Sequence, residues 1–254
     1  DKTLEPIVMS DTINSLIHTG DIFNALVLDK ERERISKFLL DRGYYRFSPK
    51  NISYDADTLG GNNKANINVV IKKDVINYTQ RGVPIITDNS IFRIRNISIK
   101  AKDNAEIAAL SSNKKLQFDS IEYRGLNIRF KGKKPQIRPE VLRSTITLYP
   151  NYLYNQSQAN QTYSNLMSTG YFTSPRIKFD TIPNSGYNLV SLLRADSTYA
   201  SKIDYIQERY LDCNIEYTPA LQHGLKAELE AATTSSFFGL TAVLGYQNRN
   251  IFRG

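Results

Sequence analysis

Glu228 and Glu230, two residues apart, form a pair of carboxylates of the kind that acid–base catalysis of glycoside hydrolysis uses. Both lie in a segment where apolar and polar side chains alternate, so both belong to the polar side of one strand. A strand with one polar and one apolar face accounts for the pair better than an active site does. No catalytic residue is assigned to them.

The remaining reactive side chains are few and scattered. Cys213 is the only cysteine, so an internal disulfide is excluded, and it lies in an alternating apolar run typical of a buried strand. His18 and His223 lie far apart without metal-ligand spacing. Gly60-Gly61 lacks the following Lys-Ser or Lys-Thr of a phosphate-binding loop and indicates a turn. The sequence predicts no metal, no cofactor and no enzyme.

Composition favours a globular, strand-rich protein. The 254 residues include 16 Tyr and 11 Phe but no Trp, and aromatic residues are enriched in strands. The net charge of +8 suits an anionic partner, but Lys and Arg are dispersed, and only Lys131, Lys133 and Lys134 cluster. No nucleic-acid partner is predicted.

An internal repeat organises the chain, because residues 24–49 resemble residues 151–175. Each copy reads as a helix that ends at a glycine, Gly43 or Gly170, followed by an aromatic pair. The first helix is expected to begin at Asp29 as its N-cap. In the second copy the expected buried stripe comprises Ala159, Tyr163, Leu166 and Met167.

Strands are expected after both helices and before the second. They lie at 51–57 and 67–71, then at 92–100, 176–182 and 211–217, with a hairpin at 120–130, short helices at 11–17 and from Arg138, a linker at 77–89 and an insertion at 184–208. No opening strand is visible in residues 1–10. The order favours an α+β fold with helices on a mixed sheet.

The C-terminal segment predicts two amphipathic strands, 225–232 and 238–246, around a turn at 233–236. One face of such a pair suits lipid and the other suits water. A two-stranded open sheet leaves backbone groups that lipid cannot satisfy. We therefore expect a transmembrane β-barrel that is cut shortly after it begins.

The repeated pattern of helix, glycine, tyrosine and strand resembles POTRA domains, which precede the barrel in outer-membrane assembly proteins of the BamA/TamA superfamily. Residues 28–47 look particularly like TamL, the lipoprotein-type relatives of TamA. The final residues resemble the start of the barrel in the same superfamily. This barrel-start motif comprises Gly245, Tyr246, Gln247, Asn248, Arg249, Asn250, Phe252, Arg253 and Gly254.

The resemblance implies tandem POTRA domains of order β-α-α-β-β, followed by the first strands of a truncated transmembrane β-barrel. The expected boundaries are a POTRA domain at 1–78, a linker at 79–89, a second POTRA domain with an inserted hairpin and loop at 90–219, and the barrel start at 220–254. It also implies an outer-membrane protein with this region mainly in the periplasm of a Gram-negative bacterium.

In function, the resemblance implies binding of unfolded outer-membrane proteins by β-augmentation, with accessory assembly or translocation subunits and outer-membrane lipid as further partners. An exposed sheet edge can pair with an incoming strand through backbone hydrogen bonds with little sequence selectivity. The expected client-binding edges comprise Ile52, Ser53 and Tyr54, and Ile177, Lys178 and Phe179. The competing interpretation is that these side chains only pack on their own helices.

Three other functions stay open at the level of sequence. A secretion pore of the same superfamily would export one dedicated polypeptide. A soluble periplasmic adaptor would bind peptide or cell-wall polymer without a membrane segment. An enzyme with a strand-rich fold would need a pocket of perturbed titratable groups, which no motif here indicates.

Overall fold

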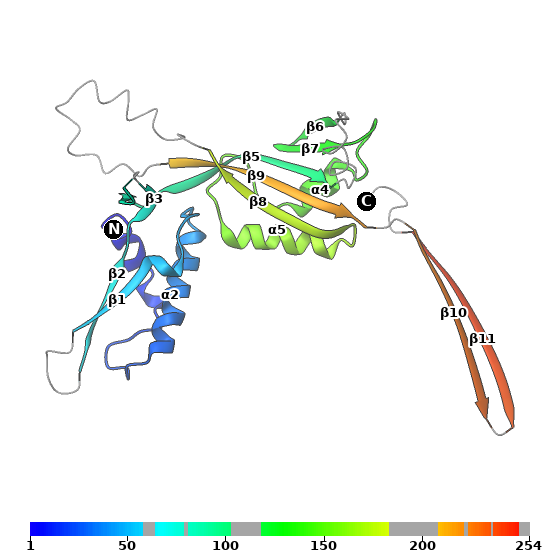
Figure 1. The fold of residues 1–254 in the computed structure, drawn as a ribbon, viewed down its shortest axis with the longest axis horizontal. Coiled ribbons are helices and arrows are strands. Elements are labelled where there is room, and N and C mark those ends of the chain that lie inside the picture. The colour runs from blue at the N-terminus through cyan, green and yellow to red at the C-terminus, as the bar shows by residue number, and fades with distance from the viewer. Residues whose placement is uncertain are drawn as a thin grey trace. The chain divides into compact units, whose positions relative to one another are not determined.

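The computed structural model describes residues 1–57, 64–78, 81–102, 118–182, 208–220, 223–234 and 236–248 (Figure 1). They form two compact units. Unit 1 comprises residues 1–95, 150–158 and 180–212, and unit 2 comprises residues 96–149, 159–179 and 213–254. The division cuts across long strands and one helix.

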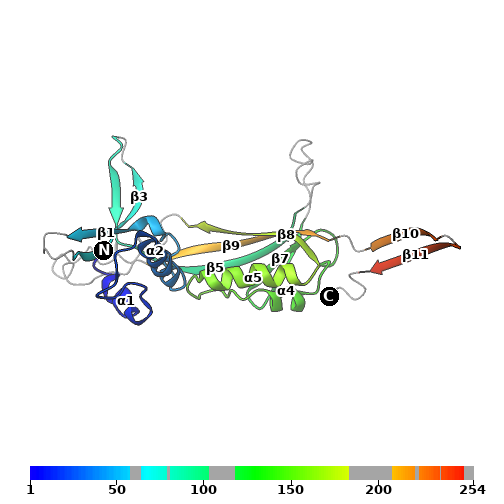
Figure 2. The same cartoon turned by 90° about the horizontal axis from the view of Figure 1, so that it is seen from below.

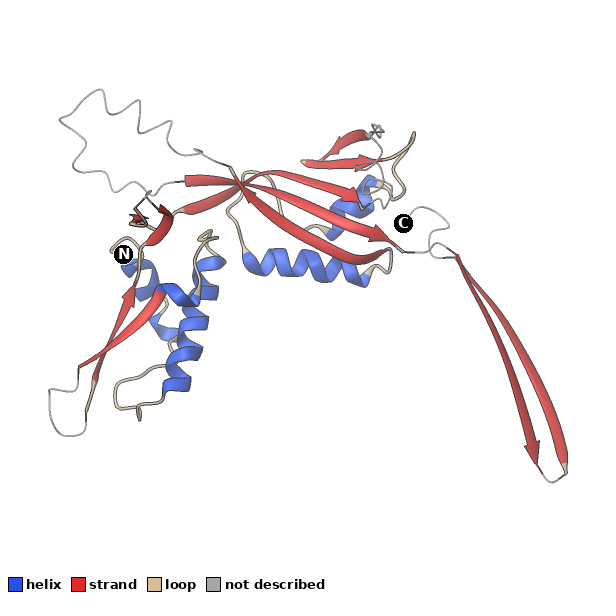
Figure 3. Ribbon diagram, viewed as in Figure 1, coloured by secondary structure: helices blue, strands red, loops and turns tan. Residues whose placement is uncertain are grey.

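Helices and strands are both well represented (Figure 3). The chain runs through α1 (Glu5–Met9), a 3₁₀ turn (Thr12–Asn14), α2 (Ala25–Leu40), a 3₁₀ turn (Pro49–Asn51), β1 (Ile52–Asp57), β2 (Asn66–Ile71), β3 (Asp74–Tyr78), β4 (Pro84–Thr87), β5 (Ile91–Ala101), β6 (Asp119–Tyr123), β7 (Leu126–Phe130), α4 (Pro139–Thr145), α5 (Gln156–Ser168), β8 (Phe172–Thr181), β9 (Glu208–Pro219), β10 (His223–Thr234) and β11 (Phe237–Asn248).

In unit 1, α2 packs on the antiparallel pair β1–β2, which runs in register from Ile52 opposite Ile71 to Asp57 opposite Asn66. The core between them consists of buried apolar side chains from every part of the module. They are Leu4, Ile35, Leu39, Tyr44, Phe47 and Ile52. Leu4, the N-cap residue of α1, enters this core, so residues 1–10, where no strand is expected, contribute a short helix.

The start of α2 differs from the expectation. The helix begins at Ala25, and the side chain of Asn24 caps it by accepting from the Leu26 amide at 2.9 Å. Asp29 lies inside the helix and pairs with Arg32. The Asp29 N-cap was wrong because Asn24 is an equally good cap and Ala25 and Leu26, which follow it, favour the helix.

Two further differences concern short elements of unit 1. The helix expected at 11–17 is a single 3₁₀ turn, because hydrogen bonds to Glu31 on α2 hold Ser15 and Leu16 out of helical geometry. The linker expected at 77–89 contains β4, which pairs antiparallel with β3. β-branched residues in both strands favour this hairpin, and they outweigh the Pro and Gly that suggested a linker.

The larger sheet has the strand order β6-β7-β5-β9-β8 and is mixed, since β5 pairs parallel with β7 and β6 pairs antiparallel with β7. The hairpin turn at Arg124-Gly125 has positive φ at both positions, as expected for a two-residue turn. The short helix α4 begins with Pro139, as the sequence predicts. The α+β class with a mixed sheet is confirmed.

Helices α4 and α5 pack against this sheet (Figures 1 and 2). α5 buries Ala159, Thr162 and Leu166, whereas Tyr163 and Met167 are each 45% exposed. The expected stripe was therefore wrong at Tyr163 and Met167. The polar Thr162 takes the inward position because its hydroxyl accepts from the Thr147 amide, so burial leaves its oxygen satisfied.

Gly43 and Gly170 end α2 and α5 with positive φ, +99° and +71° respectively. Their surroundings differ. A Cβ at Gly43 would lie 2.7 Å from Ile91 Cγ2, whereas a Cβ at Gly170 would meet nothing within 4 Å. Gly43 O also accepts from the Phe92 amide at 2.8 Å, so the glycine joins α2 to the start of β5.

Replacing each glycine by alanine separates the cost of left-handed backbone strain from the cost of a steric clash. Gly170→Ala introduces only left-handed strain and is expected to lower the free energy of unfolding by about 1 kcal/mol. Gly43→Ala adds a clash with Ile91 and is expected to lose about 2–3 kcal/mol. Urea unfolding followed by circular dichroism measures both values. Equal losses would mean that the close approach at Gly43 costs nothing.

Candidate functional site

The first candidate edge is β1, whose backbone groups alternate in direction. Asn51 O accepts from the Lys72 amide at 2.7 Å, so Asn51 faces β2. Alternation along the strand turns the backbone of Ser53 toward β2 as well, and the backbone of Ile52 and Tyr54 away from it. Of the three expected residues, two present backbone groups to the open edge of this two-stranded sheet, and Ser53 does not.

The side chains of these two residues lie in the core. Ile52 is 3% exposed. Tyr54 packs against the same cluster, and its hydroxyl donates to Leu28 O at 3.0 Å. Burial, together with the nearby charge of Glu31, raises the pKa of Tyr54 to about 12. The side chains of Ile52 and Tyr54 therefore pack in the core of unit 1, and client binding at β1 stays a prediction.

The second candidate edge is β8, the outermost strand of the larger sheet in the described part of the chain. The Ile182 amide donates to Tyr210 O on β9 at 3.1 Å. Alternation from there turns the backbone of Lys178 toward β9 and that of Ile177 and Phe179 away from it. The expected residues again divide into two outward positions and one inward position. Ile177 and Phe179 are half-buried, and Lys178 is exposed.

β8 carries an irregularity before this segment. Tyr171 O accepts from the Ala220 amide at 2.9 Å, so the backbone of Tyr171 also faces β9. Strict alternation from Ile182 would instead turn every odd-numbered residue away from β9. β8 must therefore contain one extra residue between Tyr171 and Lys178. Ser174, which has a φ of +53° and precedes Pro175, marks a β-bulge there. The strand begins at Phe172 and not at Arg176, because this bulge lets it continue past Pro175.

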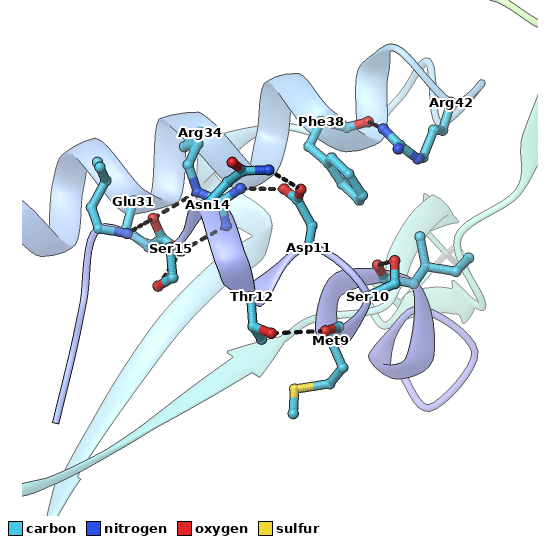
Figure 4. A network of polar contacts seen from close by, with 12 residues as sticks. Met9, Ser10, Asp11, Thr12, Asn14, Ser15, Glu31, Arg34, Phe38 and Arg42 are labelled. Carbon is cyan, nitrogen blue, oxygen red and sulfur yellow. Dashed lines mark hydrogen bonds and ion pairs between the residues drawn. The ribbon is translucent and has the colours of Figure 1, made fainter.

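A buried ion-pair network holds residues 11–16 against α2 (Figure 4). Glu31, whose side chain is 4% exposed, accepts from Arg34 Nε and Nη2, both at 2.8 Å. It also accepts from the Leu16 amide at 2.9 Å and from Ser15 Oγ at 3.1 Å. Arg34 reaches on to Asp11. The network fixes the segment before α2, and α2 supports β1.

Both carboxyl groups of the network ionise more readily than usual. Burial of Glu31 opposes ionisation, but the hydrogen bonds from Arg34, the Leu16 amide and Ser15 outweigh it and lower the pKa of Glu31. The hydrogen bond from Asn14 lowers the pKa of Asp11, with Arg34 adding to it against burial. The stabilisation is thus complete above the ordinary Glu value of 4.5 and is lost as pH falls through the lowered values.

Unit 1 is therefore expected to lose stability between pH 5 and pH 3, in part through this network. Glu31→Gln at pH 7 is expected to lower the free energy of unfolding by about 2 kcal/mol, because Arg34 keeps Asp11 but loses its charged partner on α2. The variant's decline below pH 5 is also expected to be shallower. Glu33→Gln, at an exposed position on the same helix, is the control. Indistinguishable pH profiles for E31Q and the parent protein would contradict the assignment.

β10 and β11, of 12 residues each, form an antiparallel hairpin with two different faces. One face is apolar along most of its length, with cross-strand pairs on it. These pairs are Leu225–Tyr246, Ala227–Leu244, Leu229–Ala242, Ala231–Leu240 and Thr233–Phe238. The other face carries Lys226, Glu228 and Glu230, with Lys226 Nζ 2.5 Å from Glu228 Oε1. The alternation predicted for this segment is confirmed, and the glutamates lie on its polar face.

The apolar face is open in the described structure, with Leu225 84% and Leu229 73% exposed. At one end of it, His223 stacks on Tyr246 with ring centroids 5.9 Å apart and shares a 2.7 Å hydrogen bond with the Tyr246 hydroxyl. Of the barrel-start motif, Gly245, Tyr246, Gln247 and Asn248 belong to β11. The motif's remaining residues, Arg249, Asn250, Phe252, Arg253 and Gly254, lie outside the described residues.

Because the chain contains no Trp, a single introduced Trp reports one position of the hairpin. Leu229→Trp on the apolar face is expected to shift its fluorescence to the blue when phospholipid vesicles or detergent micelles are added. Glu228→Trp, the next residue on the polar face, is the matched control and is expected to shift less. Equal shifts at both positions would contradict a lipid-facing side.

The described residues contain no arrangement of reactive groups typical of an enzyme. Burial raises the pKa of Cys213 to about 12, which makes it a poor nucleophile. Among the ranges that the structure describes, no group of three His, Cys, Asp or Glu side chains could hold a metal ion. None of the helices described is both long enough and apolar enough to cross a bilayer. The expected client-binding residues lie in different units, on β1 and on β8.

One segment of the chain matches a known family. Residues 123–193 match the POTRA family, described as surface antigen variable number repeat. The match begins in the β6–β7 hairpin and includes α4, α5 and β8, so the second candidate edge lies inside it. No curated protein matches the sequence significantly.

Several solved structures are similar to the chain at low identity. BamA from Haemophilus ducreyi lacking POTRA domains 1–3 is 11% identical over 96% of this chain and 32% of that chain, with a TM-score of 0.43. POTRA domains 1–3 of Omp85 from Anabaena are 12% identical over 78% and 53%, with a TM-score of 0.29. POTRA domains 3–5 of Haemophilus influenzae BamA are 14% identical over 78% and 83%, with a TM-score of 0.23. The chain spans about a third of the BamA structure.

Proposed function

We propose that the chain is the periplasmic POTRA region of an outer-membrane assembly protein, and that it binds unfolded outer-membrane proteins by β-augmentation. The observation that carries the proposal is the position of β8, an edge strand inside the segment that matches the POTRA family. A nascent barrel strand offers a row of backbone donors and acceptors. An edge strand supplies the complementary row.

The geometry favours recognition through the backbone. On β1, the side chains of Ile52 and Tyr54 are taken up by the core, so an incoming strand would meet backbone N–H and C=O groups. Pairing of this kind tolerates many sequences, because the hydrogen bonds do not depend on side-chain identity. Weak selectivity suits a protein that handles many different barrel strands. The Pro-containing bulge at Ser174 limits the β8 edge to the residues after it.

The domain organisation that we propose is tandem. Residues 1–78 form the first POTRA domain, 79–89 connect it, 90–219 form the second, and 220–254 begin a membrane β-barrel. The repeated helices α2 and α5, each ended by a glycine with positive φ, support the tandem arrangement. We place the protein nearest to TamL-like relatives. The basis is the resemblance of residues 28–47 alone, and these residues lie outside the segment that matches the POTRA family.

We further propose that the hairpin β10–β11 faces outer-membrane lipid with its apolar side. Its open strand edges require neighbouring strands within lipid, since backbone groups have no other partner there. Accessory assembly or translocation subunits complete the set of partners. The carboxylates of the polar face, Glu228 and Glu230, would then lie on the side away from lipid.

The β8 edge can be tested by removing one outward backbone donor. Ile177→Pro deletes an amide that points away from β9, so the sheet is expected to remain intact while binding of an outer-membrane strand peptide weakens about tenfold. Ile177→Val keeps the amide and is the matched control, expected to bind within about twofold of the parent protein. Peptide binding is measured by isothermal titration, and folding by thermal unfolding of each variant.

The β1 edge has its own pair of variants. Ala56 is exposed, and alternation turns its backbone outward, so Ala56→Pro is the test and Ala56→Ser the control. Unchanged peptide affinity in folded Ile177→Pro and Ala56→Pro would exclude pairing at these edges.

A further inference from the structure

The open edge of β1 borders two different faces of the β1–β2 hairpin (Figure 1). The register places Tyr54 opposite Val69 and Ala56 opposite Ile67, so these four side chains share one face. It is the face on which α2 packs, since Tyr54 contacts the core of unit 1. Ala56 is exposed and Val69 is 44% exposed, so α2 covers this apolar face only in part.

The opposite face of the hairpin is polar. Asp55 pairs with Asn68 and Asp57 pairs with Asn66 across the two strands, and all four residues are exposed. Both carboxylates belong to β1, and the residues directly opposite them on β2 carry uncharged amides. A strand added at the outer edge of β1 would therefore lie beside apolar side chains on one face and beside carboxylates on the other.

Asp55 occupies a position at which a side chain of an added strand comes close. The backbone of Asp55 turns toward β2, as that of Ser53 does, and the backbone groups of Tyr54 and Ala56 on either side of it turn outward. Toward an added antiparallel strand, Asp55 is thus a non-hydrogen-bonded position. Residues paired at such positions have Cα atoms about 4.5 Å apart, closer than at hydrogen-bonded positions. The opposite side chain would lie directly beside the Asp55 carboxylate.

Electrostatics decides which side chain is favoured there. Opposite charges directly across a strand pair stabilise the pairing, and like charges destabilise it, so Asp55 favours Lys or Arg and disfavours Asp or Glu. The apolar face has a charge of its own near the edge, because Arg32 lies 5.3 Å from the ring centroid of Tyr54. Arg32 pairs with Asp29 at 2.9 Å, so its charge is balanced within α2.

We propose that the β1 edge prefers amphipathic strands whose polar side chains are cationic, and that Asp55 determines this preference. The inference rests on the proposed function, because it requires strand pairing at β1. It adds a bias by side-chain charge to recognition that otherwise depends on the backbone. The chain as a whole has a net charge of +8, which attracts anionic peptides non-specifically. A preference for cationic strands would therefore not arise from the net charge.

The test compares two strand peptides that share the same alternating valine and tyrosine residues and carry either lysine or glutamate at the polar positions. Binding is measured by isothermal titration in the Ile177→Pro background, so that pairing at β8 contributes little. The lysine peptide is expected to bind about fivefold more tightly, and high salt is expected to reduce this ratio. Adding Ala56→Pro is expected to weaken both peptides, which locates them at the β1 edge.

Substitutions at Asp55 separate the charge from the backbone pairing. Asp55→Asn is expected to bring the two affinities within about twofold of each other, and Asp55→Lys is expected to make the glutamate peptide the tighter ligand. Asp88→Asn is the matched control, because Asp88 pairs with Lys73 outside β1 and β2, and it is expected to keep the parent ratio. Thermal unfolding shows that each variant is folded.

Inversion of the preference in Asp55→Lys supports the proposal, because a purely structural role of Asp55 would change both affinities in the same direction. Equal binding of the two peptides by the parent chain, or the same ratio in Asp55→Lys as in the parent, would overturn it. Either result would leave the proposed pairing at β1 intact. Absence of binding by both peptides would overturn the pairing at β1 and the preference together.

Discussion

Every backbone N–H and C=O group in a protein needs a partner, and among the described strands the outer edges of β1 and β8 are two of those that turn such groups outward. The rest of the structure supports these edges. α2 fills the inner face of β1–β2 with Ile35 and Leu39, and α5 covers the larger sheet with Ala159 and Leu166. The core of unit 1 takes up the side chain of Ile52 and part of Tyr54, whereas on β8 Ile177 is half-buried and Lys178 is exposed.

The need of every buried polar group for a hydrogen-bond partner also explains the polar interior of unit 1. Glu31 is buried at the centre of α2, where an unpaired carboxylate would destabilise the fold, and it accepts four hydrogen bonds from Arg34, Ser15 and Leu16. Those bonds also fix the irregular segment before α2. An apolar residue at this position would bury equally well, but it would leave Arg34 and the Leu16 amide without this acceptor.

Local sequence signals predicted the elements with strong periodicity or special backbone geometry. Gly43 and Gly170 end their helices as expected, Arg124-Gly125 makes the hairpin turn, and the alternation from Leu225 gives the two faces of β10–β11. The expected buried stripe of α5 was wrong because a tertiary partner decided which side chain lies inward. Thr162 is buried because Thr147 satisfies its hydroxyl, a contact between residues that no periodicity connects. The candidate edges could be located to a strand, but the direction of each backbone group could not, because it depends on the register with the neighbouring strand.

The most direct measurement is amide hydrogen exchange of the chain with and without an unfolded outer-membrane strand peptide. The outward amides, those of Tyr54 on β1 and Ile177 on β8, are expected to exchange rapidly in the free protein and to become protected when the peptide binds. The inward amides of Ser53 and Lys178 are predicted to be protected in both states. Protection that appears only elsewhere, or outward amides that are already protected without peptide, would contradict edge pairing as the basis of function.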